Sequence, residues 1–111
     1  MMDANPLHEK HGFVHVVYFW LIDQISEEQK RYFESELEKL GQTPTIKQYR
    51  WGTPAKSARE VVDDSFDYSW IVHFEDRAAE EIYQEHPIHL AFVENCAPLF
   101  KKVIVYDSHL H

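Results

Sequence analysis

The chain has 111 residues, 44% of them hydrophobic and 14% aromatic, which suits one domain with a packed core and argues against disorder. The formal net charge of −8 argues against nucleic acid and an anionic membrane as partners. Cys96, the only cysteine, excludes an intrachain disulfide and is interpreted as a small core residue. The N-terminus is polar and the run Phe13–Ile22 is too short for a membrane helix, so we expect a soluble, cytoplasmic protein.

The segment Phe13–Leu21 is rich in β-branched and aromatic residues, which is typical of a β-strand. Both of its faces are apolar apart from His15, so we expect both to be covered. One layer of helices covers only one face of a sheet. We therefore predict that the other face meets a second copy of the chain in a homodimer.

A helix is predicted after Ser26, because Ser26 and Gln29 have the spacing of a capping box. An apolar stripe with helical spacing follows, made of Phe33, Leu37 and Leu40. Gly41 is expected to end the helix in a left-handed conformation.

The remaining elements are predicted from alternation, turn residues and proline. They are a strand Thr45–Trp51, a loop Gly52–Asp64, a strand Phe66–Glu75 with Phe66, Tyr68, Trp70, Val72 and Phe74 on one face, a helix Ala78–Glu85, a helix from Pro87 to about Ala97, and a strand Lys102–Asp107. The order β-α-β-β-α-β predicts an α+β, ferredoxin-like domain, with an antiparallel four-stranded sheet and both helices on one face.

The segment from Tyr83 to Phe92 carries the candidate chemistry. Pro87 suits the first helical position, which makes His86 the N-cap and places His89 in the first turn. The positive end of a helix favours a neutral imidazole there, able to act as a general base near neutral pH. Tyr83, on the other side of the junction, could hydrogen-bond a carbonyl or a developing enolate. A purely structural, hydrogen-bonded Tyr83–His89 pair is the alternative interpretation.

Other histidines are also considered as site residues. His15, on an apolar strand, is either a core histidine with a partner or a second polar wall of the same pocket. His73 lies on the polar side of its strand and is expected to meet solvent or the dimer partner. Neither His86 with His89 nor His109 with His111 has the spacing of a zinc site, so no metal site is predicted.

Four segments together resemble the stress-responsive A/B barrel (Dabb) domain family. They are Phe13–Val17, Tyr49–Gly52, Ser65–Ser69 and His86–Phe92. The resemblance covers about residues 12–108 and leaves residues 1–11 and 109–111 as tails. It implies a ferredoxin-like protomer and a dimeric α/β barrel, in agreement with the burial expected for the first strand.

The branch of this family that resembles olivetolic acid cyclase implies a cofactor-free intramolecular aldol condensation. By similarity, the catalytic residues are Tyr83 and His89. The implied pocket residues are His15, Val17, Phe19, Phe33, Leu37, Trp70, Phe92, Val103 and Val105. Trp70, Phe100 and Leu37 depart from the pattern of that branch, and bulky Trp70 is expected to fill much of the pocket, which argues against the same long-tailed substrate.

The expected function is cofactor-free, cyclase- or lyase-like acid–base chemistry on a small carbonyl or phenolic compound in an apolar pocket. The alternative is a non-catalytic, stress-associated dimer that binds an apolar or aromatic ligand or acts structurally. A monooxygenase or haem-handling relative is a weaker third hypothesis, because the sequence has no recognisable haem-ligand signature and fold analogy alone is a poor guide to function.

Overall fold

The computed structural model describes residues 11–111. The tail predicted over residues 1–11 therefore lies outside the described residues, apart from His11. The elements are β1 (Phe13–Leu21), α2 (Glu27–Leu40), β2 (Ile46–Gly52), β3 (Tyr68–Phe74), α3 (Arg77–Glu85), α4 (Pro87–Cys96), a short 3₁₀ turn (Ala97–Leu99) and β4 (Phe100–His109). Strands pair in the order β2-β3-β1-β4, and every pair is antiparallel.

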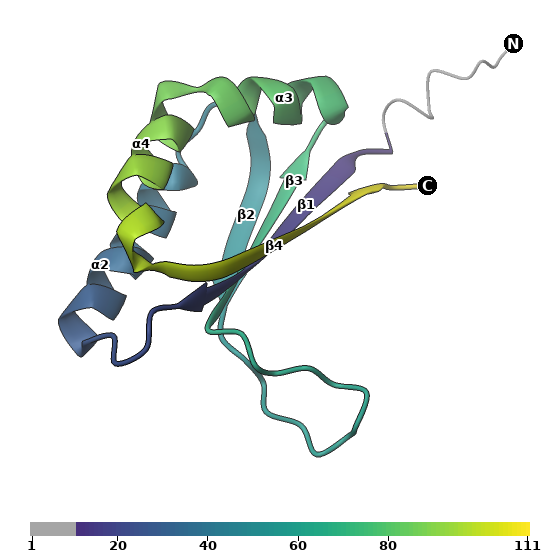
Figure 1. Ribbon diagram of the computed structural model, residues 1–111. Coiled ribbons are helices and arrows are strands. Elements are labelled where there is room, and N and C mark those ends of the chain that lie inside the picture. The colour runs from purple at the N-terminus through teal and green to yellow at the C-terminus, as the bar shows by residue number, and fades with distance from the viewer. Residues whose placement is uncertain (1–10) are drawn as a thin grey trace, which may run out of the picture.

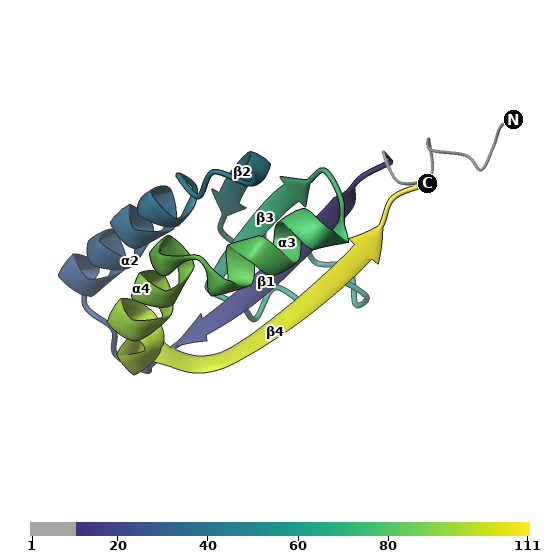
Figure 2. The same ribbon diagram turned by 90° about the horizontal axis from the view of Figure 1, so that it is seen from above.

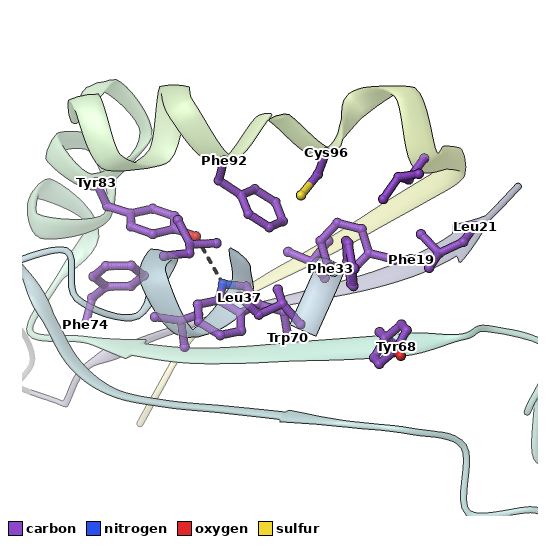
Figure 3. Close-up of a cluster of buried hydrophobic side chains, with 14 of the residues drawn as sticks. Phe19, Leu21, Phe33, Leu37, Tyr68, Trp70, Phe74, Tyr83, Phe92 and Cys96 are labelled. Atoms are coloured by element: carbon purple, nitrogen blue, oxygen red, sulfur yellow. Dashed lines mark hydrogen bonds between the residues drawn. The ribbon is translucent and has the colours of Figure 1, made fainter. Parts of the chain in front are cut away.

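The helices all lie on one face of this sheet, as Figures 1 and 2 show from two directions. Order and topology together confirm the ferredoxin-like prediction. β1 lies between β3 and β4, and alternate β1 residues from Phe13 to Leu21 are buried under the helices. Buried residues of β1 and β3 pack against α2 and α4, and the resulting cluster of aromatic rings is the hydrophobic core (Figure 3).

The start of α2 agrees with the prediction from the sequence, but its end does not. The Ser26 hydroxyl accepts from the Gln29 backbone N–H at 3.0 Å, and the Gln29 side chain accepts from the Ser26 backbone N–H at 2.9 Å. Gly41, however, has φ −64°, so the left-handed prediction was wrong. A Cβ at Gly41 would lie 2.4 Å from the Tyr49 ring, so close packing of β2, not the backbone conformation, requires this glycine.

Two predicted strands have different bounds in the structure. β3 begins at Tyr68, because Asp67 instead bonds the end of β1: its side chain accepts from the Leu21 N–H at 2.7 Å and its N–H donates to the Phe19 carbonyl at 2.8 Å. Phe66 therefore packs against Tyr18 on the opposite face from Trp70, which corrects its predicted position. β4 begins two residues before and ends two residues after the predicted Lys102–Asp107, because it pairs with β1 along the whole length of that strand.

The face of the sheet that the helices leave open is largely apolar. Its residues include Val14, Val16, Tyr18, Trp20, Ile71, Ile104 and Tyr106. Tyr106 is 61% exposed in the single chain. In residues 11–111, no helix combines the length and hydropathy needed to cross a membrane.

Candidate functional site

A cavity of about 120 Å³ lies between the sheet and the two helices α3 and α4. Its lining consists of His15, Val17, Phe19, Leu40, Trp70, Tyr83, Gln84, His89, Phe92, Val93, Phe100, Val103 and Val105. Tyr83 and Trp70 are 1% and 0% exposed and form its floor, whereas Val103 and Val105 on the edge strand β4 are 41% and 47% exposed. The cavity therefore opens beside β4.

Tyr83 reaches the cavity from the last turn of α3, and its hydroxyl is held by the sheet. The Trp70 Nε1–H donates to the Tyr83 oxygen at 3.1 Å, the dashed line in Figure 3. Because the indole only donates, the phenolic proton remains available to another acceptor. Burial raises the pKa of Tyr83 well above its ordinary value, so the phenol stays protonated.

His89 faces Tyr83 across the junction between α3 and α4, with 4.8 Å between the ring centroids. The junction forms as predicted: the His86 Nδ1 accepts from the Ile88 backbone N–H at 3.0 Å, and Pro87 is the first residue of α4. The His89 Nδ1 is buried and has no hydrogen-bond partner within residues 11–111. This atom is therefore enclosed by the protein without a hydrogen bond, while His89 as a residue lines the cavity.

The surroundings of His89 favour its neutral form. Burial is the largest cause of a lowered pKa, and His15 lowers it further, while a hydrogen bond to the Gln84 backbone opposes the shift. The ring is therefore neutral on the wall of the cavity that it shares with Tyr83, and a neutral imidazole has one nitrogen that accepts a hydrogen bond or a proton.

His15 forms the opposite wall and belongs to a cluster of three ionisable side chains, here called the His15 cluster. Its Nδ1 lies 2.6 Å from the Asp107 Oδ1 and 3.6 Å from the Glu80 Oε2. A carboxylate only accepts hydrogen bonds, so Nδ1–H donates to Asp107. The His15 ring centroid is 5.7 Å from that of Tyr83.

Most residues predicted for the site line this one cavity, but two do not. Phe33 and Leu37 are fully buried in the core beside it and are absent from its lining. Residues that the site prediction omitted also line it, namely Leu40, Gln84, Val93 and Phe100. Val93 is one helical turn after His89, so helical periodicity was the signal that pointed to it.

The partners of His15 were also missing from the predicted site. Glu80 lies three residues before Tyr83 on the same helix face, which was a weak sequence signal. Asp107 lies opposite His15 in the β1–β4 register, and nothing in the local sequence around either residue shows this pairing.

A second hollow, of about 300 Å³, lies on the open face of the sheet. It is lined by Tyr18, Trp20, Asp63, Phe66, Ile104 and Tyr106. Although it is larger, it lacks a histidine or a buried acid–base pair, so the smaller cavity is the better candidate site.

Comparison with known proteins adds a family match and several similar folds. The model of the Stress responsive A/B Barrel Domain family matches residues 13–110. No curated protein matches the chain in sequence.

Among solved structures, a hydroxynitrile lyase from Passiflora edulis has a TM-score of 0.80 at 22% identity, with 92% of this chain and 95% of that chain covered. A dimeric ferredoxin-like protein of unknown function from Thermobifida fusca has a TM-score of 0.75 at 22% identity, with 89% and 91% covered. A Dabb family protein with a ferredoxin-like fold from Mesorhizobium loti has a TM-score of 0.69 at 25% identity, with 87% and 95% covered.

Proposed function

This chain belongs to the stress-responsive A/B barrel domain family, and on that premise we propose that it forms a homodimer whose subunits each catalyse acid–base chemistry on a small carbonyl or phenolic compound. His89 is the general base, and Tyr83 is the hydrogen-bond donor to the reacting oxygen. The observation that carries this proposal is a neutral, half-buried His89 ring beside a protonated Tyr83 at one apolar cavity.

The proposed step is abstraction of a proton. The proton comes either from the carbon next to a carbonyl group or from a hydroxyl group whose own carbon becomes a carbonyl carbon. The His89 imidazole takes the proton. In the first case the C–H electron pair moves toward the carbonyl oxygen. In the second, with a hydroxynitrile, the O–H electron pair forms the new C=O bond while the carbon–nitrile bond breaks, and cyanide leaves and takes the proton back from His89. In the first case the Tyr83 O–H donates to the developing enolate, an interaction that strengthens as charge accumulates. The low polarity of the lining raises the strength of both contacts.

The cavity volume limits the substrate to a ring-sized molecule. A dry cavity of about 150 Å³ holds benzene, and this one is smaller, about 120 Å³. Trp70 provides much of the floor, in keeping with the expectation that it would fill the pocket. A substituent longer than one ring would extend through the mouth beside Val103 and Val105.

The test is turnover of a panel of small hydroxynitriles, β-diketones and short polyketide-like ketoacids. The hydroxynitriles are included because a structure of similar fold is a hydroxynitrile lyase. For a substrate that is turned over, His89→Gln is expected to lower kcat about 10²- to 10⁴-fold and Tyr83→Phe about 10²-fold. His86→Asn is the matched control, because asparagine retains the N-cap and kcat should not change.

Unchanged kcat in both His89→Gln and Tyr83→Phe would contradict the proposed chemistry.

The second candidate is a purely structural Tyr83–His89 pair. The 1% exposure of Tyr83 and the hydrogen bond that it accepts from Trp70 favour this candidate. That candidate predicts no turnover of any panel member and no ligand-induced rise in melting temperature. It also predicts a loss of about 1–3 kcal/mol in Tyr83→Phe, because a buried donor is left unpaired.

The dimer is proposed through the open face of the sheet. Its apolar side chains support this, as does the dimeric description of the similar Thermobifida fusca protein. Tyr106→Asp is expected to give a folded monomer by light scattering, because a buried carboxylate in the interface would have no partner. Tyr32→Asp, on the exposed side of α2, is the control and should remain dimeric. A wild-type monomer at micromolar concentration would refute the dimer.

A further inference from the structure

The His15 cluster joins three separate elements of the fold at one point. His15 comes from β1, Glu80 from α3 and Asp107 from β4, and their ligand-type atoms all lie within 4.8 Å of one another. Such convergence of an imidazole and two carboxylates on rigid elements is a preformed set of metal ligands.

The charges of the cluster do not balance without a further cation. Two carboxylates share one imidazole, which contributes at most one positive charge. Neither carboxylate forms an ion pair with a lysine or arginine of residues 11–111. The Glu80 side chain is only 9% exposed, and its other partner is the neutral Gln84 amide, which donates at 2.6 Å. Buried carboxylates are normally paired with a cation or bound to a metal ion.

From these contacts we propose that His15, Glu80 and Asp107 bind a divalent transition metal ion, with Zn²⁺ as the best fit. One imidazole and two carboxylates are ligands that Zn²⁺ accepts in tetrahedral sites with one open position. An imidazole nitrogen in the set disfavours Mg²⁺, which prefers six oxygen ligands.

The distances between the ligand atoms must adjust to accept this ion. Ligand atoms about 2.0–2.1 Å from a tetrahedral ion lie about 3.3 Å apart. The 3.6 Å between His15 and Glu80 is already close to this value, whereas the 2.6 Å between His15 and Asp107 must lengthen. Asp107 has room to move, because its side chain is 42% exposed. For its Nδ1 to bind the metal, the His15 imidazole must carry its proton on Nε2.

The surroundings also provide an outer shell. The Gln84 amide orients Glu80 as outer-shell partners orient metal ligands. Of the three ligands, only His15 also lines the cavity, near Tyr83. This metal site goes beyond the proposed function, because proton transfer at the Tyr83–His89 pair does not require it. Sequence spacing showed no metal site, because these ligands are far apart in the chain.

The experiment titrates chelator-treated protein with Co²⁺, a spectroscopic substitute for Zn²⁺, and follows visible absorption and calorimetric heat. His109→Asn/His111→Asn is the background for all variants, so that the C-terminal histidines do not contribute. We expect saturation at one ion per chain, displacement of Co²⁺ by Zn²⁺ and little effect of Mg²⁺. Glu80→Gln and Asp107→Asn should each weaken Co²⁺ binding at least about tenfold.

Two control variants make the result specific. Glu81→Gln removes the same charge from the exposed side of α3 and should bind Co²⁺ as the background protein does. Tyr83→Phe should also bind Co²⁺ unchanged, so the metal site and the proposed chemistry can fail independently. Absence of saturable binding, or binding that neither Glu80→Gln nor Asp107→Asn weakens, overturns the proposal. If Glu80→Gln does not fold by circular dichroism, Asp107→Asn on the half-exposed strand decides.

Discussion

The cavity has two walls that hold their histidines in opposite ways. His89 lies at the start of a helix, where burial and a neighbouring imidazole disfavour its charged form, and its Nδ1 has no hydrogen-bond partner among residues 11–111. His15 lies on a central strand, where its Nδ1 faces two carboxylates. The same side chain is therefore held neutral on one wall and donates a hydrogen bond to a carboxylate on the other.

The difference shows how surroundings divide roles between like residues in a small site. In such a site, the titratable group that is kept neutral can take a proton. The titratable group that is bonded to charged partners instead holds a proton or a cation. Tyr83 lies between the two rings, with 4.8 Å to His89 and 5.7 Å to His15.

The largest expected effect on stability comes from replacing Trp70, which donates a hydrogen bond to Tyr83 at the floor of the cavity. Trp70→Ala should lower the free energy of unfolding by about 3–5 kcal/mol, because it empties a fully buried volume and removes the donor to Tyr83. Urea denaturation measures the loss. Trp20→Ala, on the open face, should cost clearly less in a monomeric background. Equal losses would mean that Trp70 does not anchor the cavity floor.

An intermediate effect should separate the two histidines. In the presence of a chelator, His15→Leu should cost about 1–3 kcal/mol, because Asp107 loses its hydrogen-bond donor and buried Glu80 loses the neighbouring imidazole. His89→Leu should cost less, since the ring loses one hydrogen bond to the Gln84 backbone and its Nδ1 has no partner within residues 11–111. Thermal unfolding of both variants at neutral pH gives the comparison. A larger loss in His89→Leu would show that the His15 cluster contributes little to stability.

The smallest expected effect is the pH dependence due to His89. Its lowered pKa means that, as pH falls below the ordinary histidine value of about 6.5, the unfolded chain takes up a proton before the folded chain does. The stability contributed by the neutral ring is complete above that pH and declines as pH falls through the window toward the lowered pKa.

Urea denaturation at about pH 7.5 and about pH 5.5 tests this slope. The wild-type protein should lose more stability between these pH values than His89→Gln does, because glutamine does not titrate. His86→Asn, which retains His89, should keep the wild-type slope. Parallel behaviour of wild type and His89→Gln would argue that His89 is not held neutral by the fold.

Local sequence predicted those features whose causes lie within a few residues. The Ser26–Gln29 capping box, the His86 N-cap and the position of Pro87 all formed as expected, because each depends on contacts within one helical turn. The prediction failed where contacts from distant elements decide: Gly41 is required by the Tyr49 ring, and Phe66 turns away because Asp67 bonds the end of β1.

For the candidate site the same division holds. The sequence by itself determined the element order, the inward stripe of β1 and the placement of Tyr83 and His89 on either side of Pro87, because alternation and helix-start chemistry are written in neighbouring residues. Only the tertiary structure decided that Trp70 donates to Tyr83 and that Glu80 and Asp107 reach His15. Those contacts arise from strand register and helix packing, which bring together residues that the sequence keeps far apart.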